Sequence, residues 1–362
     1  MIPNGSVEWT NGIIVTNQIF IRAQNYTRTP AGTVGSGATS RNITITNNSN
    51  AAIFSFTTGN SFHCGLAGIA FIDGSGDGAH FSIAGSGSKV ALVNDIYMTV
   101  RERYSPTEQP IRWNARGGVI WNLVADASGE TAAGGGVGTL GGGMFVSSPL
   151  AWNTAPTFGS LDTSGDVNVY LESSTIINCG QWPDIDDNGR FVARHCVFDG
   201  TWGITHGFTS TWGGRYFEYY DNVFSVTYNV SPYRNMAGRY FWCRAGTGLF
   251  TDNAANTPAN TSEWGNVKQL DIGDNTNPTP YPQARQPGFG HDGATDVSDP
   301  IYIWNQTGGR AYVWGVTAIW STNVVEGRDI FVNAGAKPSY SKYTYPHPLT
   351  IESVYYFPFR KP

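Results

Sequence analysis

The sequence predicts an all-β chain folded as a solenoid of short parallel strands, and three observations support this prediction. The first is a segment that occurs three times in the middle of the chain, at residues 169–177, 191–198 and 216–224. Each copy is rich in β-branched or aromatic residues and is bounded by Gly, Asp or Asn. Aligned on Ile177, Phe198 and Phe224, the copies lie 21 and 26 residues apart. A strand-and-turn unit of this period is typical of a solenoid, because one unit cannot bury its apolar face alone.

The second and third observations are the composition and the lack of a helical period. Charged residues make up 14% of the 362 residues, against roughly 25% in a typical soluble domain. Gly contributes 45 residues, and with Asn, Ser and Thr it suits tight turns between short strands. No window holds a sustained apolar pattern at i, i+3, i+4 and i+7, which argues against an all-α fold. We therefore expect one elongated repeat domain over residues 1–362.

Strand signals follow one another at regular steps from residue 42 onward. With Ala70, Met98 and Ile120 taken as equivalent centres, the steps are 28 and 22 residues, which matches the repeat. Three short strands per turn, joined by Gly, Asn or Asp corners, fit the coil of a parallel β-helix. The Gly-rich stretch 132–143 lacks the Lys-Ser/Thr and helix of a phosphate-binding loop. It predicts a flexible loop or a corner of plain backbone, and a protruding loop beside a binding groove is favoured over a nucleotide role.

Two stretches are expected to depart from the regular coil. Residues 254–299 are rich in Pro, Asn, Gly and Asp, which predicts an irregular loop insertion. Residues 335–362 include Tyr-Thr-Tyr-Pro-His-Pro and predict a C-terminal tail that packs on the solenoid.

Charge and hydropathy exclude two classes of partner. A net charge of −5 argues against nucleic acid, because phosphate binding needs a Lys/Arg surface. No run approaches 18 apolar residues, so no membrane span is expected. The N-terminus has no basic start followed by an apolar run, so no secretory signal is visible. Because a strand signal at residues 5–9 follows Met1 almost at once, we expect an upstream segment, a virion component or self-association to cover the N-terminal coil.

The cysteines offer no zinc pattern, because Cys64, Cys179, Cys196 and Cys243 form no C-x-x-C pair. Cys179 and Cys196 lie about one repeat apart, so a disulfide between stacked coils is one reading. Buried free thiols are the favoured reading.

Several stretches resemble right-handed parallel β-helix proteins of the pectate-lyase-like superfamily. The opening, residues 2–10, is similar to their first coil. Residues 190–198, 206–207 and 215–224 resemble the repeats of an uncharacterised bacterial and phage branch, and 326–329 and 343–349 resemble its ending. The resemblance spans most of the chain and implies a single-domain right-handed parallel β-helix with loop insertions. It implies an extracellular or virion-associated protein that binds a polysaccharide, although the same fold carries lyases, hydrolases, tailspikes and inert structural proteins.

Enzymes of this kind act on polysaccharides in two ways. A lyase needs a base beside a uronate and a cation for the developing negative charge, a role in which calcium is common. A glycoside hydrolase needs two or three carboxylates around the glycosidic oxygen. No calcium-binding trio of carboxylates on successive coils is evident, so no metal ligand is assigned, and the sequence does not decide whether the protein is an enzyme.

One cluster suits either chemistry. The candidate catalytic residues are Asp186, His206, Arg215 and Glu218, with His206 as base. Arg190 and Arg244 are candidates for holding a uronate or sulfate group. Arg190 and Arg215 precede equivalent strands and are expected to stack on one side. A purely structural reading stands beside each: Asp186 in a turn, His206 bonded at a corner, and the charges in surface ion pairs.

Aromatic residues gather in the same region. Trp202, Trp212 and Tyr219 are candidates for stacking on sugar rings, and interior stacking in the solenoid is the competing reading. Strand alternation places Phe217 and Phe224 inside, and their odd spacing implies a bend between them. We therefore expect a polysaccharide-binding protein, with a non-catalytic phage tail or capsid-decoration component as the alternative.

Overall fold

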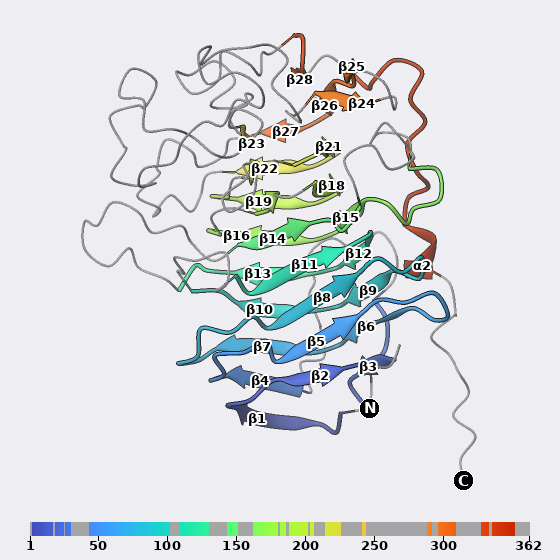
Figure 1. Cartoon of the computed structure of the whole chain (residues 1–362). Helices are drawn as coiled ribbons and strands as arrows, with labels where there is room; N and C mark the ends of the chain where they lie inside the picture. Colours follow the sequence, from blue (N-terminus) through green and yellow to red (C-terminus); the bar gives the residue numbers. More distant parts are fainter. Residues whose placement is uncertain are drawn as a thin grey trace, which may run out of the picture.

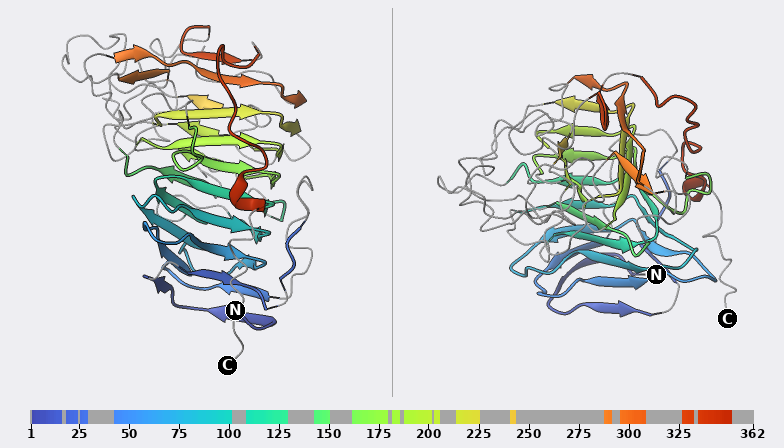
Figure 2. Two further views of the ribbon diagram at one scale, coloured as in Figure 1. Left: turned by 90° about the vertical axis from the view of Figure 1, so that its right-hand side faces the viewer. Right: turned by 45° about the horizontal axis from the view of Figure 1, so that its top comes forward.

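The computed structural model describes sixteen stretches of the chain: residues 2–16, 19–24, 26–29, 43–101, 109–129, 143–150, 162–179, 182–185, 188–201, 203–205, 214–225, 241–243, 288–291, 296–308, 327–332 and 335–351. These residues form a right-handed parallel β-helix whose coils stack along one axis (Figure 1). Each coil passes through three sheets, here called sheets I, II and III, and Figure 2 shows the stack from the side and tilted from above. The predicted all-β solenoid is confirmed.

Each sheet takes one strand from successive coils. Sheet I contains β1 (Gly5–Trp9), β4 (Ile43–Asn47), β7 (Ala70–Asp73), β10 (Tyr97–Thr99), β13 (Val124–Asp126), β16 (Thr175–Ile177), β19 (Val197–Asp199), β22 (Val223–Ser225) and β27 (Thr307–Gly308). Sheet II contains β2 (Ile13–Val15), β5 (Phe54–Thr57), β8 (Phe81–Gly85), β11 (Ile111–Ala115), β14 (Met144–Ser147), β17 (Asp184–Ile185), β20 (Gly203–Thr205) and β23 (Phe241–Cys243). Sheet III contains β3 (Phe20–Arg22), β6 (Cys64–Ala67), β9 (Ala91–Asn94), β12 (Gly118–Trp121), β15 (Val169–Glu172), β18 (Arg190–Arg194), β21 (Tyr216–Tyr220), β26 (Ile301–Trp304) and β28 (Ile330–Val332).

The described chain adds two short elements outside these sheets. Strands β24 (Phe289–His291) and β25 (Asp296–Ser298) form an antiparallel pair within the predicted insertion. Helix α2 (Pro348–Ile351) lies near the end of the chain. None of the helices in the described part of the chain is long and apolar enough to cross a membrane.

The corner between sheets III and I is the most regular feature of the coil. From β6 onward it always has two residues, and the first of them has a left-handed backbone. These first residues are Gly68, Asp95, Asn122, Ser173, His195, Asp221 and Asn305. Gly, Asn and Asp tolerate this conformation best, which explains their recurrence between the apolar runs. The bend expected between Phe217 and Phe224 is the corner at Asp221.

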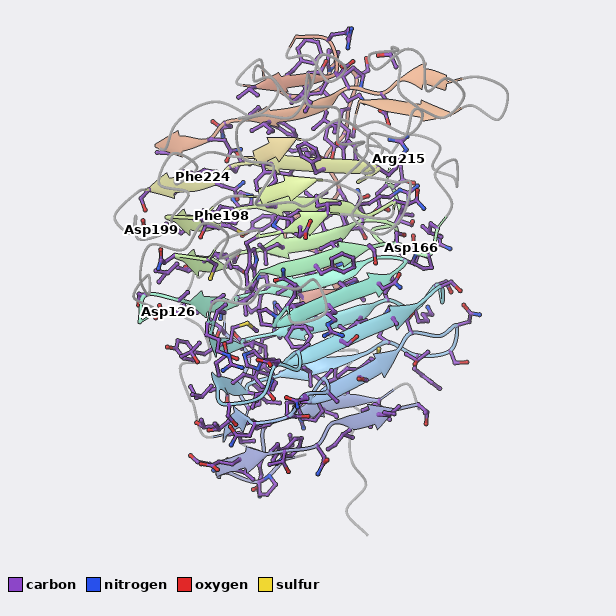
Figure 3. All side chains as sticks on the ribbon, turned by 60° about the vertical axis from the view of Figure 1, so that its left-hand side comes forward. Asp126, Asp166, Phe198, Asp199, Arg215 and Phe224 are labelled. Carbon is purple, nitrogen blue, oxygen red and sulfur yellow. The ribbon has the colours of Figure 1, made fainter. Side chains whose placement is uncertain are left out.

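Aromatic and β-branched side chains fill the interior. Phe198 and Phe224 lie on adjacent coils of sheet I, with ring centroids 4.9 Å apart and nearly parallel planes (Figure 3). Phe217 and Phe224 are both buried, as alternation predicted.

The predicted register was wrong by one residue in β16. Ile176 pairs with Phe198 and lies inside, whereas Ile177 pairs with Asp199 and points outward. Both positions are isoleucine, so the apolar pattern alone could not choose between them.

The predicted equivalence of Ala70, Met98 and Ile120 was also wrong. Met98 pairs with Phe71 on one side and with Ala125 on the other, whereas Ile120 belongs to sheet III. The apolar run around Ile120 crosses the two-residue corner, so it holds strands of two sheets.

Candidate functional site

The outer face of sheet III is covered by two segments of the chain itself. Residues 335–351, here called the strap, run along this face from β28 to α2, which packs on β9 and β12 (Figure 2). Further along the face, Tyr26 and the amide of Thr29 donate to the buried Asp95, and Arg28 lies over the Trp121 ring at 4.9 Å. This face therefore offers no open groove along these strands.

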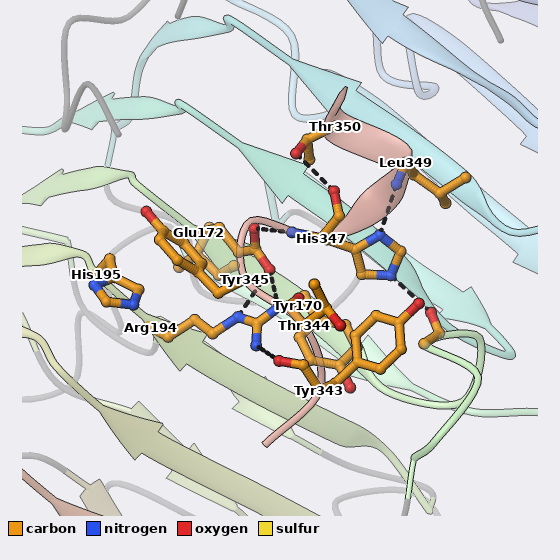
Figure 4. Close-up of polar contacts among 12 residues, drawn as sticks. Tyr170, Glu172, Arg194, His195, Tyr343, Thr344, Tyr345, His347, Leu349 and Thr350 are labelled. Carbon is orange, nitrogen blue, oxygen red and sulfur yellow. Dashed lines mark hydrogen bonds and ion pairs between the residues drawn. The ribbon is translucent and has the colours of Figure 1, made fainter. Parts of the chain in front are cut away.

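Three buried carboxylates hold the strap. Asp299 accepts from Lys337, and Glu218 accepts from the hydroxyl of Tyr340 at 2.6 Å. Glu172 accepts from the backbone N–H of His347 at 2.9 Å. Between these points the Arg194 guanidinium donates to the carbonyls of Tyr343 and Thr344 (Figure 4).

Two of the predicted catalytic residues belong to this covered region. Glu218 is fully buried in β21 and accepts from the hydroxyls of Tyr216 and Tyr340. Arg215 is fully buried just before β21 and pairs with Asp299 at 2.9 Å. Burial raises the pKa of Glu218 to about 7, against the opposing effect of the two tyrosine hydroxyls. In this position both residues bind other parts of the protein.

Two of the predicted substrate-binding residues are buried as well. Arg190 pairs in register with Tyr216, so it is offset by one residue from Arg215, not stacked on it. Burial, followed by the nearby charge of Arg215, lowers the Arg190 pKa to about 9. Tyr219 lies inside the coil and packs on Phe191, Phe198 and Phe224, which is the interior stacking that the sequence left as the alternative.

Sheet II differs from sheet III because long connections between strands lie along both of its edges. On the side entered from sheet I, the spans 100–110, 127–143 and 226–240 precede β11, β14 and β23. On the side leading to sheet III, the spans 148–168, 206–215 and 244–300 follow β14, β20 and β23. Beyond the first coil, the III–I corner never exceeds two residues. Loops that vary in length on a rigid scaffold are where binding groups concentrate.

The outer face of sheet II carries one continuous column of side chains. Ser55, Ser82, Arg112, Phe145 and Asp184 are successive register partners, one from each coil. Ser55, Ser82, Arg112 and Phe145 alternate with buried core residues such as Trp113 and Val146 and are partly exposed, so they point outward, whereas Asp184 is buried. Arg112 and Phe145 are half-buried neighbours on adjacent strands.

The strands of sheet II also end in register. Ile185 of β17, Thr205 of β20 and Cys243 of β23 are Cα partners on three successive coils. The next positions in the chain are Asp186, His206 and Arg244, three of the predicted site residues. These three, together with Trp202 and Trp212, lie outside the described residues.

An aromatic ring and a guanidinium side by side can hold a sugar that carries a negative charge. The ring offers an apolar surface to the C–H face of the sugar, and Arg112 offers paired donors to a carboxylate or sulfate. Within the described stretches, no group of three or more His, Cys, Asp or Glu side chains is placed to hold a metal ion. The described cysteines, Cys64, Cys179 and Cys196, are buried free thiols, and burial raises the pKa of Cys64 and Cys196 to about 12.

Sequence reasoning missed Arg112 and Phe145 on sheet II, and Glu172 and Arg194 beneath the strap. The alternation in Ile111-Arg112-Trp113-Asn114-Ala115 was a signal for an outward Arg112. Glu172 and Arg194 gave no such signal, because their partners in the strap lie 149 to 175 residues away.

The comparisons with known proteins add no assignment. No family model matches the chain, and neither the curated proteins nor the solved structures contain a match.

Proposed function

We propose that the protein binds a polysaccharide along the outer face of sheet II, as an extracellular or virion-associated β-helix protein of pectate-lyase-like type. The observation that carries this proposal is that, beyond the first coil, the long connections between strands lie at the two edges of that sheet. Sheet III is closed by the strap and by residues 26–29. A long sheet face bordered by loops on both sides suits an extended polymer better than a compact ligand.

The described side chains favour an acidic sugar. Arg112 beside Phe145 combines a charged donor pair with an apolar ring. In the sequence, Asp186, His206 and Arg244 directly follow Ile185, Thr205 and Cys243, which are register partners in β17, β20 and β23. In this proposal His206 acts as base, Asp186 as the carboxylate, and Arg244 as the cation for a uronate, if the protein cleaves what it binds.

A panel of acidic and neutral polysaccharides tests this proposal. Binding is followed by calorimetry, and cleavage by new reducing ends and by the absorbance of unsaturated uronates. Arg112→Ala should weaken binding, and His206→Ala should reduce any cleavage by at least about 100-fold, the low end for losing an acid–base group. Asp126→Asn, at a strand end of sheet I, is the matched control and should change neither. Binding that is unchanged in both Arg112→Ala and Arg244→Ala would remove sheet II from consideration.

The second candidate is a non-catalytic structural component of a phage virion. It is favoured by the first coil, where Val7, Ile13, Ile14 and Ile19 are 41%, 43%, 77% and 48% exposed. Val7 pairs with the buried Ile45 and Ile13 with the buried Phe54, so these exposed side chains of the first coil form an apolar surface that a partner could cover. Sedimentation at increasing concentration distinguishes the candidates: assembly that Ile13→Asp abolishes, without binding to any polysaccharide, supports the structural role.

A further inference from the structure

The strap carries a histidine whose two ring nitrogens are both engaged. The His347 Nε2–H donates to the carbonyl of Gly165 at 2.9 Å, and Nδ1 accepts the N–H of Leu349 at 3.2 Å (Figure 4). The second bond is an N-cap of α2, because the acceptor stands two residues before the donor. A proton on Nδ1 would face the N–H of Leu349 and break this bond, so the docked strap requires neutral His347.

The strap also covers a carboxyl group that has no basic side chain among its hydrogen-bond partners. Glu172 is paired with Arg194, and Asp299 with Arg215 and Lys337. Glu218 has only the hydroxyls of Tyr216 and Tyr340, both on Oε2. An ionised carboxylate at this buried position is costly, and release of Tyr340 would open it to water.

We propose that the strap is a clasp with two proton-sensitive contacts of opposite sense. Protonation of His347 favours release in acid, and ionisation of Glu218 favours release as the pH rises towards neutral. The two effects overlap, so the docked strap keeps nearly constant stability over a pH range in which either contact alone would loosen it.

Proton linkage determines whether each contact strengthens or weakens docking of the strap as the pH changes. Burial lowers the pKa of His347 to about 4, so the released strap binds a proton more readily, and docking is lost as the pH falls from about 6.5 towards 4. Burial raises the pKa of Glu218 to about 7, so the docked form binds the proton more readily, and docking is lost as the pH rises from about 4.5 towards 7.

Other charged groups face these two contacts. Around Glu218 they are Arg194 and Lys337, with the hydroxyls of Tyr216 and Tyr340. Around His347 they are Arg194 and His63, with the rings of Tyr170 and Tyr343 against the imidazole. Glu172, whose pKa burial raises, and His195, whose pKa burial lowers, also touch the strap. Glu172 and His195 are present in every variant described below. Their contribution to the pH dependence of docking therefore cancels when a variant is compared with the unaltered protein.

Hydrogen exchange of the strap amides between pH 4.5 and 7 tests the clasp, after correction for intrinsic exchange rates. Over this range the unaltered protein should change its protection by less than about 5-fold, because the two linkage terms oppose each other. Glu218→Gln should lose protection as the pH falls, by at least about 30-fold between pH 6.5 and 4.5. His347→Asn, which keeps an N-cap acceptor, should lose protection by a similar factor as the pH rises over the same interval.

The double variant Glu218→Gln/His347→Asn should return to a nearly level profile. The test compares how the protection factor changes with pH, not its absolute value. The double variant therefore remains informative even if one single variant holds the strap weakly at every pH. Two single variants that follow the unaltered profile, or that change in the same direction, would overturn the proposal.

Discussion

Arg194 and Glu172 form a buried ion pair between adjacent coils of sheet III, with Arg194 Nε 2.8 Å from Glu172 Oε1 and both side chains fully enclosed (Figure 4). Arg194 also lies over the Tyr170 ring at 4.8 Å and donates to the hydroxyl of Tyr220 at 2.7 Å. Through the carbonyls of Tyr343 and Thr344 the same guanidinium reaches the strap. One side chain thus joins three successive coils to the C-terminal segment.

Replacing Arg194 by Met should lower the free energy of unfolding by about 3–5 kcal/mol, because Glu172 would remain buried without its cation. Urea denaturation measures this loss. Arg101→Met is the matched control: in its pair with Asp77 the two side chains are 27% and 65% exposed, so the expected loss is below about 1 kcal/mol. Equal losses in the two variants would contradict the buried pair.

Neighbouring isoleucines in β16 test the corrected register. Ile176→Ala should cost about 2–5 kcal/mol, because Ile176 is fully buried between Ala125 and Phe198. Ile177→Ala should cost less than about 1 kcal/mol, because Ile177 points outward beside Asp199. The reverse order of the two losses in thermal or urea unfolding would restore the register expected from the sequence.

Arg215→Met should affect stability and not ligand binding. The change removes a fully buried ion pair and leaves Asp299 in contact with Lys337, so the free energy of unfolding should fall by about 3–5 kcal/mol. Below the unfolding transition, the dissociation constant of any polysaccharide found in the panel should stay within about twofold, a change of less than about 0.5 kcal/mol. A large loss of polysaccharide binding by the folded variant would show that Arg215 belongs to the binding site.

The described thiols should be unreactive in the folded protein. Cys64, Cys179 and Cys196 are buried, and burial raises the pKa of each, so almost no thiolate is present at pH 8. Alkylation followed by peptide mapping should label these three only after unfolding, without prior reduction. Alkylated Cys179 and Cys196 peptides that appear only after reduction would reinstate the disulfide reading.

The sequence predicted the fold because the signal is local. β-Branched segments that end in residues tolerant of a left-handed backbone can be recognised in the sequence without knowing which strand pairs with which. The strand register was harder to predict, because either residue of the pair Ile176-Ile177 could face the interior. The choice depends on Asp199, one coil later in sheet I.

The candidate site was harder to predict because a charged residue in a strand can either face a ligand or form a buried contact within the protein. Arg215 and Glu218 were assigned to chemistry because they belong to a cluster of charged residues in the central repeats. Their partners are Asp299 and Tyr340, 84 and 122 positions later. Only the folded chain shows that these charges are enclosed, whereas the alternation around Arg112 already pointed outward.

Distances along sheet I test the parallel stacking most directly. Seven outward positions are successive register partners: Thr44, Ala70, Tyr97, Val124, Thr175, Val197 and Val223. Spin labels on Val223 and Tyr97, four coils apart, should lie about 19 Å from each other, and labels on Val223 and Thr44, six coils apart, about 29 Å. Electron paramagnetic resonance distances that increase by about 10 Å between these pairs would support the parallel β-helix. Distances that do not increase with coil number would contradict it.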